Sequence, residues 1–306
     1  MLVMEVHLHT NSSCNLHCLH CYNRSVPSGE GAYLINGELS GLLQILCDDF
    51  NAEIHLEGGE IFLYPEAIRI LGTLNPKFLN NITLTTNGTI FVGDSDVLEV
   101  LRMLGNFRVS VEGHTNEQNM QLRGIGLGGI IRNALRYQSE GVPVCLRITL
   151  TSRNYGGMVD ETLPYFMSLG FKNMQVYEFQ SIGRGRESSS DFALGESLQE
   201  FFTLLVRHGK YSGASVKIML PARRIAETET YKDSLEAAGI GVEFLPKEEG
   251  ISINPDGDVF LCAWDDNKNN ALFNFRREGL AKMPGLLRNL ELTHHCENCS
   301  ALRLTA

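Results

Sequence analysis

The sequence lacks any apolar run that approaches the roughly 20 residues of a membrane-spanning helix. Its N-terminal segment also lacks the apolar core of a signal peptide, because Glu5 and His7 interrupt it. Basic residues are in the minority, at 26 against 36 acidic residues, and the resulting net charge of −10 disfavours nucleic acid as a partner. These absences predict a cytoplasmic protein that contacts neither a membrane nor nucleic acid.

The chain of 306 residues suffices for one large or two medium domains, and no low-complexity segment divides it. Its eight cysteines are unevenly spaced, with three near each end of the chain. In a cytoplasmic protein, cysteines bind metals or act in catalysis more often than they form disulfides. The sequence therefore predicts two metal sites and two free thiols, Cys47 and Cys145.

Short β-rich runs alternate with helical patterns along much of the chain. The runs cover residues 4–10, 53–57, 82–87, 107–112, 144–150 and 174–179. Such alternation predicts βαβ units and a parallel sheet of six strands. Polar and apolar residues also alternate within the runs, and the apolar face must contact the helices, so the polar face points inward. This pattern favours an α/β fold, an open partial (β/α)6 barrel around a wet cavity, over a sheet with one solvated face.

The front cysteines, Cys14, Cys18 and Cys21, directly follow the first expected strand with the spacing C-x3-C-x2-C. They should lie at the carboxyl end of the sheet, where α/β folds place their chemistry. A structural zinc site would need a fourth ligand, such as His17 or His20. A cubane iron–sulfur cluster held by three thiolates would instead keep one iron free to bind another molecule.

This spacing resembles the signature of the radical S-adenosylmethionine (SAM) enzymes. Three further segments, at residues 56–65, 83–88 and 109–124, resemble motifs of that family in the same order, and residues 181–187 resemble its last turn. The resemblance covers about residues 4–190. It implies that the free iron of a 4Fe-4S cluster chelates SAM, and that an electron from a reductase such as flavodoxin or ferredoxin cleaves SAM to a 5′-deoxyadenosyl radical.

The resemblance also implies a set of cofactor-binding residues. His20 would lie near the adenine, Glu60 would accept a hydrogen bond from the methionine amino group, and Ser110 and Arg147 would contact the carboxylate and the ribose. The full expected set is His20, Gly58, Gly59, Glu60, Thr85, Asn87, Ser110 and Arg147. A competing interpretation is that Glu60 caps a helix.

The back of the chain combines "GDVFLC", which ends at Cys262, with the later pair Cys296 and Cys299. This combination resembles the auxiliary iron–sulfur domains called SPASM and Twitch, and it implies a β-hairpin and a second 4Fe-4S cluster on these three cysteines. The fourth ligand is not assigned, because the expected upstream cysteine is absent. A zinc site completed by His294 or His295 is the alternative.

The expected organisation is a barrel at residues 1–190, a helical or irregular connection at 191–250 and an auxiliary domain at 251–306. Relatives with this organisation often modify ribosomally made peptides, so the first expectation is a peptide maturase that crosslinks, epimerises or oxidises a precursor peptide. A small-molecule dehydrogenase or cyclase is the alternative, and a non-catalytic iron–sulfur or zinc protein is the alternative of another class. The first strand lies so near the N-terminus that no leader-binding domain is expected before it.

Two inward-facing residues are candidates for a direct catalytic role. Cys145 shares a strand face with Arg147, and an inward thiol would be able to return a hydrogen atom to a substrate radical. Tyr177 is a weaker candidate on the same grounds.

Overall fold

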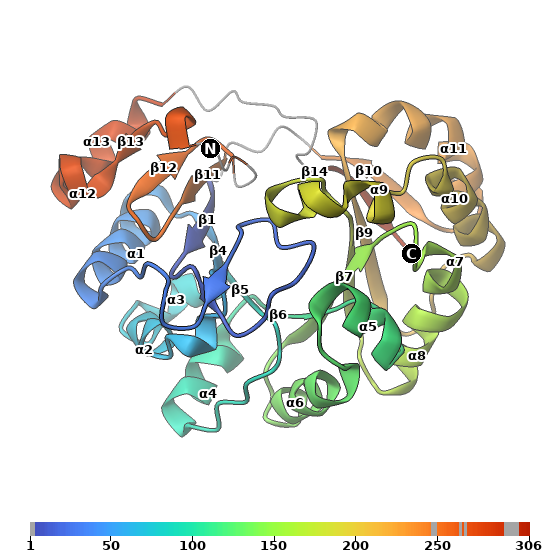
Figure 1. Cartoon of the computed structure of the whole chain (residues 1–306), viewed down its shortest axis with the longest axis horizontal. Helices are drawn as coiled ribbons and strands as arrows, with labels where there is room; N and C mark the ends of the chain where they lie inside the picture. The colour runs from blue at the N-terminus through green and yellow to red at the C-terminus, as the bar shows by residue number, and fades with distance from the viewer. Residues whose placement is uncertain (1–3, 246–249, 263–264, 266–267, 291–299) are drawn as a thin grey trace.

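The structure is a computed structural model, and it describes residues 4–245, 250–262, 265, 268–290 and 300–306. Six parallel strands lie side by side in chain order at the centre of one curved sheet (Figure 1). They are β1 (Glu5–His9), β4 (Glu53–Glu57), β5 (Ile82–Thr86), β6 (Asn106–Val111), β7 (Val144–Leu150) and β8 (Asn173–Glu178). The six predicted strands and their parallel order are therefore confirmed.

Both sides of this central sheet carry additional strands. Beyond β8 lie β9 (Ser215–Pro221), which is parallel to it, and then β14 (Ser300–Thr305) and β10 (Gly241–Phe244). Beyond β1 lie β11 (Gly250–Ile253), β12 (Asp258–Phe260) and β13 (Phe273–Asn274). The two outermost strands, β10 and β13, do not pair with each other in the described part of the chain, so the predicted open sheet is confirmed.

Helices lie around the outside of the curved sheet (Figure 1). They are α1 (Asn36–Phe50), α2 (Glu66–Leu71), α3 (Pro76–Leu79), α4 (Ser95–Met103), α5 (Asn116–Arg123), α6 (Leu127–Ser139), α7 (Tyr155–Gly157), α8 (Leu163–Ser168), α9 (Ser189–Phe192), α10 (Ser197–His208), α11 (Ile225–Ala237), α12 (Phe275–Glu278) and α13 (Met283–Arg288). Helix α4 shows why they form: the Asp94 carboxylate caps the backbone N–H of Asp96, and Val97 and Leu101 are buried one turn apart. None of the described helices is both long and apolar enough to span a membrane.

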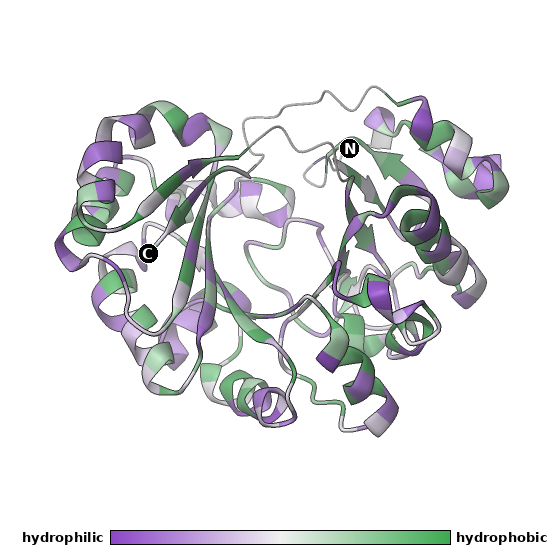
Figure 2. Cartoon of the chain, turned by 180° about the vertical axis from the view of Figure 1, so that it is seen from behind, coloured by the Kyte–Doolittle hydropathy of each residue, from purple (hydrophilic) through white to green (hydrophobic). Residues whose placement is uncertain are grey.

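The strands alternate as the sequence predicts. In β1, Val6 and Leu8 are fully buried beneath the helices, whereas His7 lies on the opposite, concave face. The parallel register places His7 beside His55 of β4, so polar side chains line up across neighbouring strands. Figure 2 shows the sheet from behind, with hydrophobic and hydrophilic residues mixed along its strands. The concave face is therefore polar, as expected.

The connection at residues 191–250, expected to be helical or irregular, contains the helices α10 and α11 and also the strands β9 and β10, which were not expected. The physical reason is visible in β9, where Val216, Ile218 and Leu220 are fully buried and alternate with Lys217 and Met219. The segment thus continues the strand–helix alternation of the barrel and adds a seventh parallel strand to it.

The predicted C-terminal hairpin is present as β11 and β12, joined by a turn in which Gly257 has a φ of +97°. Strand β11 pairs with β1, so the hairpin extends the barrel sheet. Cys262 is buried two residues beyond β12. Cys296 and Cys299 lie outside the described residues, as do His294 and His295.

Glu178 connects the barrel to the segment at residues 191–250. This buried residue at the end of β8 binds two consecutive arginines of that segment. Its carboxylate lies 2.8 Å from the guanidinium of Arg223 and 2.9 Å from that of Arg224. We expect Glu178→Gln to lower the free energy of unfolding by about 3 kcal/mol in chemical denaturation, because two guanidinium groups would then face a neutral amide. Glu227→Gln is the matched control, because its carboxylate also binds Arg224 but is 39% exposed. The control should cost less than about 1 kcal/mol, and equal losses would contradict this account.

Candidate active site

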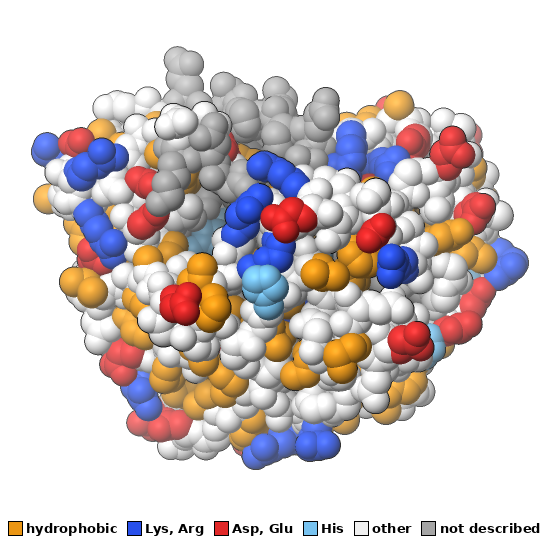
Figure 3. All heavy atoms as spheres, in the orientation of Figure 1, with side chains coloured by type: hydrophobic (Ala, Val, Ile, Leu, Met, Phe, Trp, Pro, Cys, Tyr) orange, Lys and Arg blue, Asp and Glu red, His pale blue; other side chains and the backbone are white. Residues whose placement is uncertain are grey.

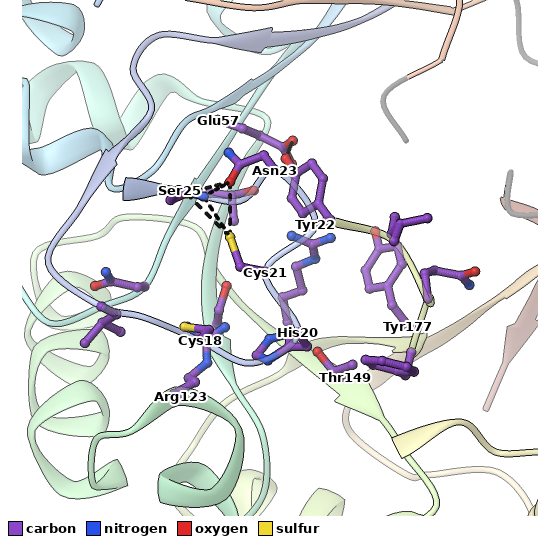
Figure 4. Close-up of a pocket in the computed structure, with 18 of the residues that line it drawn as sticks. Cys18, His20, Cys21, Tyr22, Asn23, Ser25, Glu57, Arg123, Thr149 and Tyr177 are labelled. Atoms are coloured by element: carbon purple, nitrogen blue, oxygen red, sulfur yellow. Dashed lines mark hydrogen bonds between the residues drawn. The ribbon is translucent and has the colours of Figure 1, made fainter. Parts of the chain in front are cut away.

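The three front cysteines lie on the loop that follows β1, at the carboxyl end of the sheet. Cys14, Cys18 and Cys21 all line one cavity of about 1140 Å³, a volume that includes its open mouth. Figure 4 shows Cys18 and Cys21 on this loop, with Tyr22, Arg123 and Tyr177 around the same space. Cys14, Cys18 and Cys21 are free thiols. The predicted convergence of the front thiols on a cavity is therefore present.

On one side, the loop packs directly against the Gly58–Gly59 backbone. The backbone N–H of Gly59 donates to the Asn11 carbonyl at 2.8 Å, and that of Glu60 donates to the Ser13 carbonyl at 2.8 Å. A β-carbon on Gly59 would lie 1.9 Å from the Ser13 carbonyl oxygen, which no side chain permits. Gly58 and Gly59 thus allow their backbone to approach the cysteine loop closely, and both also line the cavity.

On the other side, the turn after β8 clamps the same loop. The Arg184 guanidinium donates to the carbonyls of Cys18, at 2.8 Å, and Ser25, at 2.6 Å. The Arg184 backbone N–H donates to the Cys21 carbonyl at 2.9 Å. A β-carbon on Gly183 would lie 2.1 Å from the Tyr22 carbonyl oxygen. Sequence analysis singled out this turn but missed Arg184, whose role depends on a contact across 166 residues.

Glu60 is buried, and its carboxylate already accepts three hydrogen bonds. The donors are the Phe62 backbone N–H at 3.1 Å, the Thr86 hydroxyl at 2.7 Å and the Asn87 backbone N–H at 2.7 Å. The first of these caps the short 3₁₀-helix Ile61–Leu63. Among the described residues, Glu60 does not belong to those that line the cavity. The geometry matches the capping interpretation, and the expected contact with a methionine amino group stays a prediction.

Thr85, Asn87 and Ser110 line the cavity as expected. The Asn87 amide nitrogen lies 3.7 Å from the Cys14 sulfur. The hydroxyl of Thr85 is buried and has no hydrogen-bond partner among the described residues. A buried polar atom without a partner is unfavourable unless a ligand or water satisfies it.

His20 and Arg123 share one buried carboxylate, that of Glu112. Its Oε1 atom lies 3.0 Å from His20 Nε2 and 2.8 Å from Arg123 Nε, and its Oε2 atom accepts from the Thr149 backbone N–H at 3.0 Å. Burial alone would raise the Glu112 pKa, but the charges of His20 and Arg123 and these hydrogen bonds lower it to about 2. The carboxylate therefore stays ionised and fixes both side chains at the cavity wall.

Sequence analysis missed Arg123, although it quoted the segment that contains it. This residue ends α5 and is 7% exposed, and its positive charge acts on the Cys18 thiol. A cation buried beside a cysteine is a plausible partner for an anionic ligand at that cysteine. The sequence signal was an arginine directly before the helix-ending Gly124, on the same motif-like segment, residues 109–124, as Glu112.

A second buried carboxylate, Glu57, lines the cavity and accepts a hydrogen bond from the Tyr22 hydroxyl. His7 lies between Glu57 and Glu5, 3.3 Å from an oxygen atom of each. Burial opposes a positive charge on His7, but the hydrogen bonds and charges of the two carboxylates outweigh it and raise the His7 pKa to about 10. The positive charge of His7 consequently offsets part of the negative charge on this wall of the cavity.

The ligand atoms of Glu5, His7 and His55 lie within 4.8 Å of one another, as in a metal site. However, the Arg108 guanidinium lies 3.3 Å from Nδ1 of His55. A guanidinium only donates, so Nδ1 accepts and Nε2 carries the hydrogen. Nε2 is also the atom that faces Glu5, at 3.2 Å. The geometry therefore favours a hydrogen-bonded ion cluster over a metal site.

The two candidates for a direct catalytic role lie at different depths. Tyr177 lines the cavity, and the Arg147 guanidinium stacks over its ring at 4.8 Å. Cys145 is on the same strand face as Arg147 but is 3% exposed, and burial raises its pKa to about 11. It is not among the described residues that line the cavity. Its role as a hydrogen donor stays a prediction, which this depth disfavours.

Three thiols on one loop, an adjoining cavity and an unpartnered Thr85 hydroxyl fit a 4Fe-4S cluster with SAM bound beside it.

Solved structures of other proteins share the fold of this chain. SuiB of Streptococcus suis, bound to its precursor peptide SuiA, aligns over 94% of this chain and 67% of its own, with a TM-score of 0.66 and 14% identity. The structure of anSMEcpe with AdoMet and the Cp18Cys peptide aligns over 95% and 81%, with a TM-score of 0.65 and 17% identity.

Curated relatives share more sequence over shorter spans. The subtilosin biosynthesis protein AlbA of Bacillus subtilis is 30% identical over 177 residues, which are 57% of this chain and 39% of AlbA. The AdoMet-dependent heme synthase of Methanosarcina barkeri is 26% identical over 183 residues, 58% of this chain and 51% of the synthase. This chain thus spans about half or less of each. The family model described as the radical SAM superfamily matches residues 9–163, half of the sequence. The chain belongs to the radical SAM superfamily.

Proposed function

We propose that this radical SAM enzyme removes a hydrogen atom from a ribosomally made precursor peptide, which leads to a crosslink, an epimerisation or an oxidation. The likeness to AlbA, whose name assigns it to the biosynthesis of the bacteriocin subtilosin, carries this proposal. Two neighbours in fold, SuiB and anSMEcpe, were solved with peptides bound, which supports it. The open sheet and the open mouth of the cavity are compatible with a peptide that enters from outside.

Cys14, Cys18 and Cys21 would hold the cluster, and the cavity beside them would hold SAM. When bound, the cluster and SAM supply a 5′-deoxyadenosyl radical that can remove an unactivated hydrogen atom. The Glu112 carboxylate holds His20 and Arg123 at the wall that this cofactor would contact. Arg184 holds the cysteine loop itself through the carbonyls of Cys18 and Ser25. The protein residues thus fix positions, while the cofactor would supply the reactivity.

The other expected components belong to this proposal as well. A second 4Fe-4S cluster on Cys262, Cys296 and Cys299 would pass electrons or anchor the substrate. A flavodoxin or ferredoxin would supply the electron, and the enzyme would act in the cytoplasm. The second candidate function is a small-molecule dehydrogenase or cyclase, which the likeness to the heme synthase favours. Identification of the modified product by mass spectrometry separates the two functions.

The front cluster is tested by replacement of its ligands. Alanine at Cys14, Cys18 and Cys21 should remove one cluster and abolish formation of 5′-deoxyadenosine from SAM by the anaerobic, reduced protein. Cys47→Ala is the control, because that thiol is buried in α1, within the apolar core. Undiminished 5′-deoxyadenosine formation in the triple variant would rule the assignment out.

The back cluster is tested by counting iron. After anaerobic reconstitution we expect about eight irons per chain, and about four when Cys262, Cys296 and Cys299 are all replaced by alanine, since each cubane holds four. The same samples should contain no stoichiometric zinc. A preparation with one cubane and one zinc per chain would refute the second cluster and leave the barrel chemistry unaffected.

A further inference from the structure

The concave face carries three cations on three of four consecutive strands: Arg108 on β6, Arg147 on β7 and Lys217 on β9, with β8 between the last two. The sheet register shows how they are placed. Arg147 lies beside Gln175, which lies beside Lys217, and Arg108 lies beside Cys145, two residues before Arg147 on the same face. We call Arg108, Arg147 and Lys217 the cationic wall. It faces the interior of the partial barrel. Arg147 lines the cavity that the cysteines line, whereas Arg108 and Lys217 lie below it, each two residues before a lining residue of its strand, Ser110 or Met219.

No member of the cationic wall forms an ion pair with a carboxylate among the described residues. The Arg108 guanidinium contacts a neutral ring nitrogen of His55, and that of Arg147 stacks on Tyr177. Arg108 is 8% exposed, and its Nε atom is buried with no hydrogen-bond partner in the part of the chain described here. A buried guanidinium donor without an acceptor is costly, which indicates that an acceptor comes from outside.

The carboxylates nearest to this wall are already engaged. Glu57 is close enough for the Arg147 charge to lower its pKa, but its carboxylate is bonded to His7 and Tyr22. Glu5 is likewise paired with His7. The cationic wall therefore keeps an excess of positive charge inside a protein whose net charge is −10. Such an excess attracts and orients an anionic group.

The cysteine end of the cavity has a cation of its own. Arg123 is the guanidinium whose charge acts on Cys18, and Glu112 fixes it there. Arg147 instead stacks on Tyr177 of β8. On the same strand, Gln175 lies between Arg147 of β7 and Lys217 of β9. The expected assignment of Arg147 to SAM thus has a structural competitor in Arg123, and Arg147 is available to a different ligand.

We propose that the cationic wall binds a carboxylate of the substrate and so orients the peptide beneath the cofactor. This inference rests on the proposed function and names the chemistry that the substrate must carry. A guanidinium presents paired N–H donors that match a carboxylate, and the Lys217 ammonium adds a point charge beside them. The carboxylate belongs either to an aspartate or glutamate side chain or to the C-terminus of the peptide.

Four small probes test the wall and separate these sources. N-acetylglutamate α-amide carries only a side-chain carboxylate, N-acetylglutamine carries only a C-terminal one, N-acetylglutaminamide carries none, and inorganic phosphate is the fourth. Each is titrated by calorimetry into the reconstituted enzyme with SAM bound. We expect one carboxylate probe to bind at least about ten-fold more tightly than the neutral amide, because it gains charge-assisted hydrogen bonds.

Variants tie that preference to the cationic wall. Lys217→Met and Arg108→Gln should each reduce the preference about ten-fold, whereas Lys282→Met, whose ammonium lies on the surface at 67% exposure, should preserve it. Lys217 is only partly buried, so its variant remains informative if the Arg108 variant does not fold.

Equal affinity for the charged and neutral probes, binding of phosphate alone, or a preference that survives Lys217→Met would overturn the inference. The proposed function is tested separately, by measuring the formation of 5′-deoxyadenosine and the mass of the peptide product. Selective binding of a carboxylate without peptide modification would therefore support the cationic wall and count only against the proposed function.

Discussion

The position of the cysteine loop depends on two contacts that leave no room for a β-carbon. At Gly59 the second βα turn presses its backbone against Ser13, and at Gly183 the turn after β8 presses against Tyr22. Backbone therefore meets backbone on both sides of the loop. Arg184 completes the clamp by binding two of the loop's own carbonyls. The convergence of the three thiols on one cavity follows from this packing.

The charges around the cavity divide into three walls with different roles. Glu112 pairs with His20 and Arg123 beside the cysteines, and Glu57 and Glu5 share the charge of His7 on the side of β1 and β4. In contrast, the cations on β6, β7 and β9 have no carboxylate partner among the described residues. Figure 3 shows basic side chains, with an acidic one among them, gathered near the middle of one outer face of a molecule that is acidic overall. A paired wall can hold a cofactor rigidly, while an unpaired one is suited to a substrate that comes and goes.

The sequence was sufficient to predict the central barrel. A pattern of alternating polar and apolar residues indicates both that a segment is a strand and which of its faces is apolar. It placed His7 and Arg147 on the concave face correctly. The same rule would have found β9, where Val216 and Ile218 alternate with Lys217, but the segment was expected to be helical or irregular. The pairing of β14 with β9 leaves no local pattern, because it joins segments about 80 residues apart.

The site was predicted less completely than the fold, for a related reason. Motif spacing indicated which segments meet at the cavity, but it did not show which side chains end up inside. Glu60 belongs to the expected motif, yet its carboxylate is consumed by Thr86 and Asn87. Arg123 and Arg184 became apparent only once Glu112 and the cysteine loop had positions in space. Roles that rest on contacts between distant segments require the structure.

The central claim is that the thiolates of Cys14, Cys18 and Cys21 leave one iron free for SAM. Electron paramagnetic resonance of the reduced protein, with the three back cysteines replaced by alanine, tests this claim most directly. The account predicts a single cluster whose spectrum shifts when SAM is added, because the cofactor then binds the free iron. Identical spectra with and without SAM would contradict it.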